Sequence, residues 1–402
     1  MSTPQLSRKT LKACIRHFTW AWHTVVMGTG VVGTLVSRFH FAEGSEAIKI
    51  LTLLFFFLNL FFFLVISAAT IARYYLYPEL WEPMLQHPTQ SLFIGALPMG
   101  AATLINAALT INQHYSFAGP GFLYTLWAFW WLDCAVSVFI AVGMIFVMMT
   151  KQQHSMGEMS GLWLLPVVTL IVASSTGGVL GTALANHATP HAMCAASLTT
   201  AVSFSLVLIG LSLAMMIITV YLMRLVVYGP LDPGLILSSF IILGPLGQGG
   251  FSVLVNGQNT THVALPVPLS PAVIQTICLC AAWAMWSIAL IWLFIALCSV
   301  GSVLRRQSIS FSVATWGTIF PNGAFALLTV ELGDVLESQA LNYLGAIFSV
   351  LVLLQWIYVL MKTIPAIWNT SVFNSPCVSK LDEQMLLALQ MQDAASDISH
   401  IV

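Results

Sequence analysis

Charged residues are scarce in this sequence. Only 7% of its 402 residues are Asp, Glu, Lys or Arg, whereas roughly 25% are charged in an ordinary soluble domain. Hydrophobic residues make up 58% of the chain, and many lie in runs of the roughly 20 apolar residues that a helix needs to cross a membrane. Alternating segments of about ten residues, the pattern of a membrane β-barrel, are missing. The composition therefore predicts an all-α polytopic membrane protein.

The sequence also lacks the motifs of enzymes, metal centres and nucleic-acid-binding proteins. It has no phosphate loop, no nucleophile elbow and no basic patch, and its seven cysteines show no C-x-x-C spacing. His187 and His191 are four residues apart, but Pro190 lies between them in a predicted loop, so they need not share a helical face. Asp133 is the one carboxylate clearly inside an apolar run, whereas an intramembrane enzyme needs a cluster of ionisable groups. We therefore expect no enzyme activity, no cofactor, no metal and no nucleic-acid partner.

Ten apolar runs divide the chain. The predicted spans are 19–38, 48–72, 91–111, 122–150, 162–185, 193–226, 235–257, 271–304, 311–333 and 339–365. The sequence thus predicts a cytoplasmic N-terminal tail (1–18), a ten-helix transmembrane transporter domain (19–365) and a cytoplasmic C-terminal tail (366–402).

The distribution of Lys and Arg supports this number of spans. Basic residues are retained on the cytoplasmic side of a membrane, and an error in the count would scramble their bias. With both termini cytoplasmic, only Arg38 and Lys49 of the 13 basic residues fall on the outer side, which leaves 11 inside. The sequon that begins at Asn259 then faces outward, where N-glycosylation is expected.

The odd-numbered spans contain residues that weaken a helix, and the even-numbered spans do not. Spans three, five, seven and nine each contain a proline near a glycine: Pro98, Pro166, Pro245 and Pro321. The first span carries Gly28, Thr29 and Gly30 instead. An internal proline removes a backbone hydrogen bond, and in a membrane the freed carbonyl needs protein or water beside it.

This alternation predicts five kinked inner helices, each paired with a straight outer helix that faces lipid. A ring of five parallel inner helices would enclose a central passage. The alternative is that proline and glycine serve close helix packing, which is common in membranes.

Four segments resemble a known family. They read "FTWAWHTVVMGTGVVGTLV", "LWAFWWLDCAVSVF", "GPLGQGGFSVLVNGQ" and "FSVATWGTIFPNGAFALLTVELG". Over residues 16–365 the chain resembles the tellurite-resistance/dicarboxylate transporter family, and within it the fungal sulfite efflux pumps. The resemblance implies five helical hairpins around a quasi-fivefold pore, homotrimers, and a Phe on the ninth helix that plugs the pore. Phe320 is the matching position. His23 stands where relatives commonly carry an aromatic residue, which bears on the cytoplasmic entrance.

Residues near the predicted gate have two interpretations each. Phe320 either closes the pore as a hydrophobic plug or packs against a neighbouring inner helix. Pro321 is expected to form the kink, and Asn322 either presents its amide to the pore or bonds a freed carbonyl. Since no Lys or Arg lies in the central part of a span, an anion in this pore is expected to meet only dipoles and hydroxyls, such as that of Thr29.

Asp133 is the one ionisable group clearly inside a predicted outer helix. An intramembrane carboxylate suggests a functional role by default, and this one could carry a proton coupled to anion movement. The alternative is a structural hydrogen bond to an inner helix. Replacing Asp133 by Asn separates these interpretations.

The resemblance implies a plasma-membrane anion transporter that exports sulfite or bisulfite through a channel-like, Phe-gated pore. The membrane potential and the concentration gradient would drive the anion outward. The alternative is a proton-coupled importer of C4-dicarboxylates such as malate, with the same fold. A seven-helix receptor is disfavoured, because the count of ten places both termini on one side.

Overall fold

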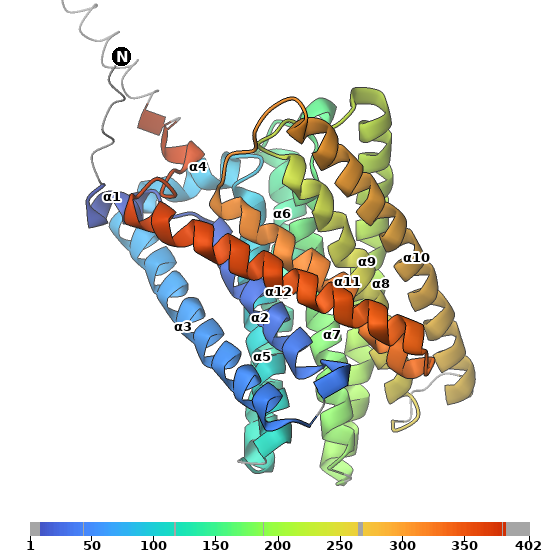
Figure 1. Ribbon diagram of the computed structural model, residues 1–402. Helices are drawn as coiled ribbons and strands as arrows, with labels where there is room; N and C mark the ends of the chain where they lie inside the picture. The colour runs from blue at the N-terminus through green and yellow to red at the C-terminus, as the bar shows by residue number, and fades with distance from the viewer. Residues whose placement is uncertain are drawn as a thin grey trace, which may run out of the picture.

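The chain is helical throughout the part that the structure describes. This computed structural model describes residues 9–42, 44–115, 118–187, 189–263, 268–379 and 381–382, and among them it contains helices, turns and bends but no strand. Long helices pack side by side into a single bundle (Figure 1). The predicted all-α class is therefore confirmed. The end of the predicted C-terminal tail, 383–402, lies outside the described residues.

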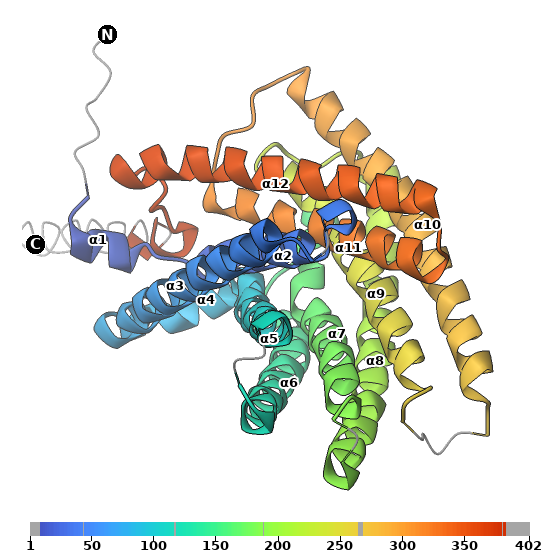
Figure 2. The same ribbon diagram turned by 60° about the horizontal axis from the view of Figure 1, so that its bottom comes forward.

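Five long apolar helices form the outer layer. They are α3 (Glu46–Leu76), α6 (Pro120–Thr150), α8 (Pro190–Tyr228), α10 (Pro271–Leu304) and α12 (Gln339–Trp368). In the most apolar stretch of each helix only 17–33% of the residues are buried. Figure 2 shows these helices on the outside of the bundle. Exposed side chains this apolar need lipid rather than water around them.

Five shorter helices form the inner layer. They are α2 (His23–Ser37), α5 (Ala96–Tyr115), α7 (Leu165–Ala185), α9 (Leu243–Asn259) and α11 (Ile319–Val335). Each inner helix contacts the next one, and α11 contacts α2, so that the contacts close into a ring. Each outer helix packs on the inner helix that precedes it in the chain. The predicted alternation of inner and outer helices, arranged as five hairpins, is therefore confirmed.

Each inner helix starts with a turn of 3-10 helix. The 3-10 segments are Trp20–Trp22, Ser91–Gly95, Gly161–Leu164, Ile236–Ile242 and Val313–Thr318. The first amide of each following α-helix donates to a carbonyl of its 3-10 segment. These amides are therefore satisfied within the backbone and are not free to bind an anion.

The prolines lie at these junctions and not inside continuous α-helix. Pro98, Pro166, Pro245 and Pro321 are each the second or third residue of an inner α-helix. Proline is tolerated in a first turn, because the amide that it lacks has no intrahelical acceptor there. The prediction of mid-helix kinks is thus corrected: the prolines lie at junctions between 3-10 and α-helix. The first span has such a junction without any proline.

Nine helices of the described residues are long and apolar enough to cross a membrane. The helix missing from this set is α2, which has 15 residues. Its neighbours surround it almost completely, since every residue from His23 to Gly33 is buried. Shorter elements complete the description: α1 (Leu11–Arg16) and α4 (Trp81–Gln86), with 3-10 turns at His40–Ala42, Pro78–Leu80 and Met156–Glu158.

Glycines let the inner helices approach one another closely. A Cβ atom on Gly30 would lie 2.1 Å from the hydroxyl oxygen of Thr103, and one on Gly28 would lie 3.3 Å from Ile319. At Gly247 of α9, a Cβ atom would lie 2.6 Å from the backbone of Ala324 on α11. Gly28 and Gly30 therefore serve helix packing, the alternative interpretation of this pattern.

Candidate functional site

Two separate cavities lie inside the ring, one toward each end of the inner helices. The N-side cavity has a volume of about 490 Å³ and lies among the 3-10 segments. All five inner units line it, through Ala21, Phe93, Leu165, Ile241 and Gly317 among other residues.

The C-side cavity lies further along the α-helices and has a volume of about 170 Å³. All five inner helices line it as well, through Val31, Thr103, Val172, Gln248 and Phe320 among other residues. The ring thus holds two chambers along one axis.

Phe320 lies close in the chain to residues that line the other cavity. Gly317 and Thr318 line the N-side cavity, whereas Phe320, two residues further on, lines the C-side cavity. The Phe320 side chain is only 3% exposed. An apolar ring held between two chambers excludes water and ions from the gap, because neither can keep its hydrogen bonds there.

The C-side cavity contains a cationic side chain that sequence reasoning missed. Arg38 caps the C-terminus of α2 and lines this cavity. Its Nη1 donates a hydrogen bond to the carboxylate of Glu331 on α11, and its guanidinium carbon lies 5.1 Å from the centre of the Phe251 ring. The expectation that an anion meets no full positive charge is therefore wrong for this chamber. Arg38 escaped notice because it stands at the end of a predicted span and not in its middle.

Polar and apolar side chains share the rest of the C-side cavity wall. The polar ones are His114 and a set of hydroxyls and amides: Thr34, Ser37, Thr103, Asn106, Thr110, Gln113 and Gln248. Two of the amides are oriented by neighbours, since Gln248 donates to Ser175 at 2.6 Å and Asn106 donates to Thr176 at 3.0 Å. These two amide groups are thus already hydrogen-bonded to hydroxyls of α7.

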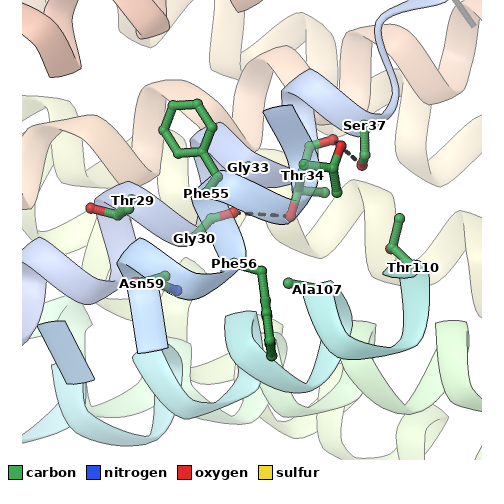
Figure 3. Close-up of a pocket in the computed structure, with 11 residues that line it drawn as sticks. Thr29, Gly30, Gly33, Thr34, Ser37, Phe55, Phe56, Asn59, Ala107 and Thr110 are labelled. Carbon is green, nitrogen blue, oxygen red and sulfur yellow. Dashed lines mark hydrogen bonds between the residues drawn. The ribbon is translucent and has the colours of Figure 1, made fainter. Parts of the chain in front are cut away.

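Thr29 lies outside both cavities. Its hydroxyl accepts a hydrogen bond from the indole nitrogen of Trp356 on α12, at 3.1 Å. It borders a gap of about 10 Å³ between α2, α3 and α5, which Figure 3 shows beside Asn59 and Thr34. A gap of this size holds about one water molecule. Thr29 is thus placed where it ties α2 to α12, away from the predicted passage.

Two further predicted pore residues point toward outer helices. His23 is 1% exposed, with its Nε2 atom 3.2 Å from the hydroxyl of Thr70 on α3, and it lines neither cavity. Asn322 donates to Gln355 of α12 at 3.0 Å, and so meets neither of the two roles predicted for it. Their neighbours Ala21 and Thr318 line the N-side cavity instead. Nearby residues of one inner helix thus face either a cavity or an outer helix. The sequence does not indicate which of them faces the cavity.

Asp133 is buried on α6 and is 6% exposed. It lines neither cavity, and no hydrogen bond to its carboxylate occurs within the described part of the chain. The structural hydrogen bond predicted as one alternative is thus absent from the described contacts. A proton on Asp133 would also stand outside the two chambers.

Asn259, the residue expected to carry a glycan, is buried in this fold. Its side chain is 2% exposed, accepts a hydrogen bond from Thr182 at 2.6 Å and donates to the carbonyl of Gly178 at 2.8 Å. A glycan needs a free amide nitrogen, and this one bonds α9 to α7. The structure thus places the amide of the sequon in a contact between helices, which the triplet itself does not indicate.

No group of three or more His, Cys, Asp or Glu side chains that could hold a metal ion occurs among the residues that the structure describes. Arg38 belongs to a small hydrogen-bonded group. Gln258 donates to Glu331 at 3.3 Å, so that Arg38, which lines the C-side cavity, is connected to Glu331 and Gln258, which do not line it.

A ring of inner helices with a chamber toward each end is suited to passing a small solute. The profile of the family described as voltage-dependent anion channel matches residues 17–364, most of the chain. This chain belongs to that family. It is therefore a multi-pass membrane protein of an anion transporter and channel family, and not an enzyme.

Individual relatives are similar over nearly the same length. The sulfite efflux pump of Trichophyton rubrum is 32% identical over 354 residues, which cover 87% of this chain and 91% of that protein. The sulfite efflux pump of Candida albicans is 27% identical, over 81% of this chain and 68% of that protein. The malic acid transport protein of Schizosaccharomyces pombe is 22% identical, over 92% and 82% respectively. The resemblance found in the sequence motifs is thus confirmed.

Proposed function

We propose that this protein exports sulfite or bisulfite through the ring of inner helices, as a gated uniporter in the plasma membrane. The observation that carries the proposal is the pair of chambers inside the ring, with Phe320 in the wall of the C-side one and Gly317 and Thr318 in the wall of the other. The substrate comes from the sulfite efflux pumps, to which this chain is more similar than to the malic acid transport protein.

The driving force for export needs no second substrate. One charge moving through 100 mV gains about 2.3 kcal/mol, which corresponds to a concentration ratio of roughly 50 at about 1.4 kcal/mol per factor of ten. For a cell that is negative inside, the anion leaves downhill once the gate opens. Proton coupling through Asp133 is not needed.

Both termini belong on the cytoplasmic side in this proposal. Arg16 before the bundle and Asp382 after it form a two-point ion pair, with bonds of 3.0 and 2.6 Å. Because the two ends meet at one face, the chain must cross the membrane an even number of times, so α2 counts as the tenth span beside the nine long helices. The tail boundaries at 18 and 366 follow from this count. Quasi-fivefold symmetry and a homotrimer with one pore per subunit are proposed from the family resemblance.

The gate is tested by comparing two buried phenylalanines of the same helix. Phe320 lines the C-side cavity, whereas Phe325 lines neither chamber and packs at 6.2 Å from Trp286 and 5.1 Å from Phe348. Phe320→Ala is expected to raise sulfite flux several-fold, because it removes the ring between the chambers. Phe325→Ala is expected to cost about 3–5 kcal/mol of stability without raising flux, and Phe325→Leu serves if that variant misfolds.

The measurement is efflux of labelled sulfite and labelled malate from proteoliposomes with a clamped membrane potential. Sulfite flux that rises with the potential supports the proposal. Malate flux without sulfite flux would establish the dicarboxylate alternative instead. A folded Phe320→Ala protein that transports no faster than the wild type would show that Phe320 only packs against its neighbours and is not a gate.

A further inference from the structure

Arg38 has a singular position in the pathway. Among the described residues that line the two chambers, it is the one Lys or Arg side chain. Three of its neighbours on the wall, Thr34, Ser37 and Thr110, carry hydroxyl groups. The chamber therefore joins one guanidinium to hydroxyl and amide groups, to His114 and to apolar side chains.

The C-side chamber would repel anions without Arg38. The inner α-helices run in one direction and end on this side, and the C-terminal end of a helix carries a partial negative charge of about half an electron. An anion that passes Phe320 therefore moves toward a set of unfavourable dipoles. A guanidinium at the C-cap of α2 offsets them at the chamber wall.

The guanidinium retains donors for a ligand. A guanidinium has five N–H donors, and among the described contacts Arg38 uses one of its nitrogens, Nη1, in a hydrogen bond to Glu331. The Arg38 side chain is 34% exposed, while that of Glu331 is only 10% exposed. The carboxylate is thus the more buried member of the pair, and the guanidinium is the more exposed one and lines the chamber.

We propose that the C-side cavity is a transient binding site for a small oxyanion on the exit side of the gate. Arg38 binds the anion through its remaining N–H donors, and Glu331 competes with the anion for the same guanidinium. This inference rests on the proposed anion export and names the residues that hold the anion after it passes Phe320.

The competition gives the site an affinity suited to transport. A buried arginine without a partner would hold an oxyanion through two charge-assisted hydrogen bonds and release it slowly. Glu331, anchored by Gln258 at 3.3 Å, recovers the guanidinium when the anion leaves. Each passing anion thus displaces the Glu331 carboxylate from Arg38, and the carboxylate then displaces the anion.

The test measures anion binding separately from transport. Sulfite is titrated against the thermal unfolding of the purified full-length protein at constant ionic strength with chloride, because a ligand that binds the folded state raises the melting temperature with its concentration. Arg38→Gln is expected to raise the half-saturating sulfite concentration at least tenfold, equivalent to about 1.4 kcal/mol. Glu331→Gln, which keeps the guanidinium and removes its competitor, is expected to lower that concentration and to slow maximal efflux.

Two controls separate binding from a structural role. Lys49 and Glu46 form an exposed ion pair on the outer helix α3, at 2.8 Å, and Lys49→Gln is expected to change nothing. The double variant Arg38→Gln/Glu331→Gln has no unpaired buried charge and is expected to bind sulfite as weakly as Arg38→Gln alone. If the pair only joins α2 to α11, both single variants lose stability and neither changes the half-saturating concentration.

The two proposals fail in different ways. Binding that depends on Arg38 in a protein that moves no sulfite would contradict the export function and leave the site standing. Sulfite efflux with the same half-saturating concentration in the wild type and in Arg38→Gln would overturn the site and leave the function standing. If Arg38→Gln does not fold, Glu331→Gln decides, since an unchanged half-saturating concentration in that variant also overturns the site.

Discussion

A close approach of two inner helices lies just beyond Phe320 and can be perturbed by one methyl group. Gly247 of α9 faces the backbone of α11, where an added Cβ atom would lie 2.6 Å from the carbonyl carbon of Ala324 and from the amide nitrogen of Phe325. Backbone atoms cannot rotate away as a side chain does. Gly247→Ala therefore forces α9 and α11 apart.

The size of the shift follows from the contact distances. An ordinary van der Waals contact of a Cβ atom begins at 3.4 Å, so the two helices must separate by about 0.8 Å at this point. Overpacking of a well-packed interior costs about 1–3 kcal/mol. Since α11 also carries Phe320, the same displacement is expected to loosen the closure between the two chambers and to raise basal sulfite flux.

The matched controls are glycines of outer helices. A Cβ atom on Gly143 of α6 or on Gly301 of α10 would meet nothing within 4 Å. Alanine at these positions is expected to leave the melting temperature unchanged or to raise it, because alanine favours a helix over glycine by about 0.8–1 kcal/mol. The three variants are compared by thermal unfolding in one detergent, followed by flux in proteoliposomes.

A melting temperature of Gly247→Ala equal to that of the wild type would refute this reasoning. It would mean that the ring of inner helices yields by 0.8 Å without cost, and that the closeness of α9 and α11 has no role in holding the gate. A loss of stability shared by the Gly143 and Gly301 variants would show that the effect is not specific to the ring.

Three further predictions concern residues away from the chambers. Burial and the charges of Lys9 and Arg16 lower the pKa of His17 to about 4. Between about pH 6.5 and pH 4 only the unfolded form therefore binds the proton, so the contact between the chain termini should weaken as the pH falls. Faster hydrogen exchange of the Ser375 amide, which donates to His17 at 3.3 Å, checks this, and His17→Asn should remove the pH dependence. Asp133→Asn should leave sulfite flux and its dependence on external pH unchanged, and a changed pH profile in well-folded protein would restore proton coupling. Asn259 should carry no glycan, so that endoglycosidase treatment of protein from a glycosylating host leaves its mobility unchanged, while Asn259→Gln should lower the melting temperature.

The two kinds of helix could be predicted from local composition. An outer helix must present apolar side chains to lipid along most of its surface, whereas an inner helix needs small residues where its neighbours approach closely. Each requirement acts on the residues of that helix itself. This is why the sequence around Pro98, Pro166, Pro245 and Pro321 identified the inner helices, even though it misplaced their bends.

The direction in which a single inner side chain points could not be predicted in this way. An inner helix is buried on every side, so no polar face distinguishes the chamber from a neighbouring helix. Thr29, His23 and Asn322 were expected in the passage and instead bond Trp356, Thr70 and Gln355 of the outer layer. Phe320 does line a chamber, but its placement was expected from family resemblance and not from its own surroundings in the sequence.

The sequence by itself determined that this chain is a helical membrane protein with alternating inner and outer helices, because composition and the positions of proline and glycine act locally. Only the tertiary structure decided what an anion would meet. Arg38 and Glu331 are 293 residues apart in the chain, and Asn259 bonds Gly178, 81 residues away. Such contacts depend on how the hairpins close into a ring, and no local sequence pattern predicts which distant residue a given side chain will contact.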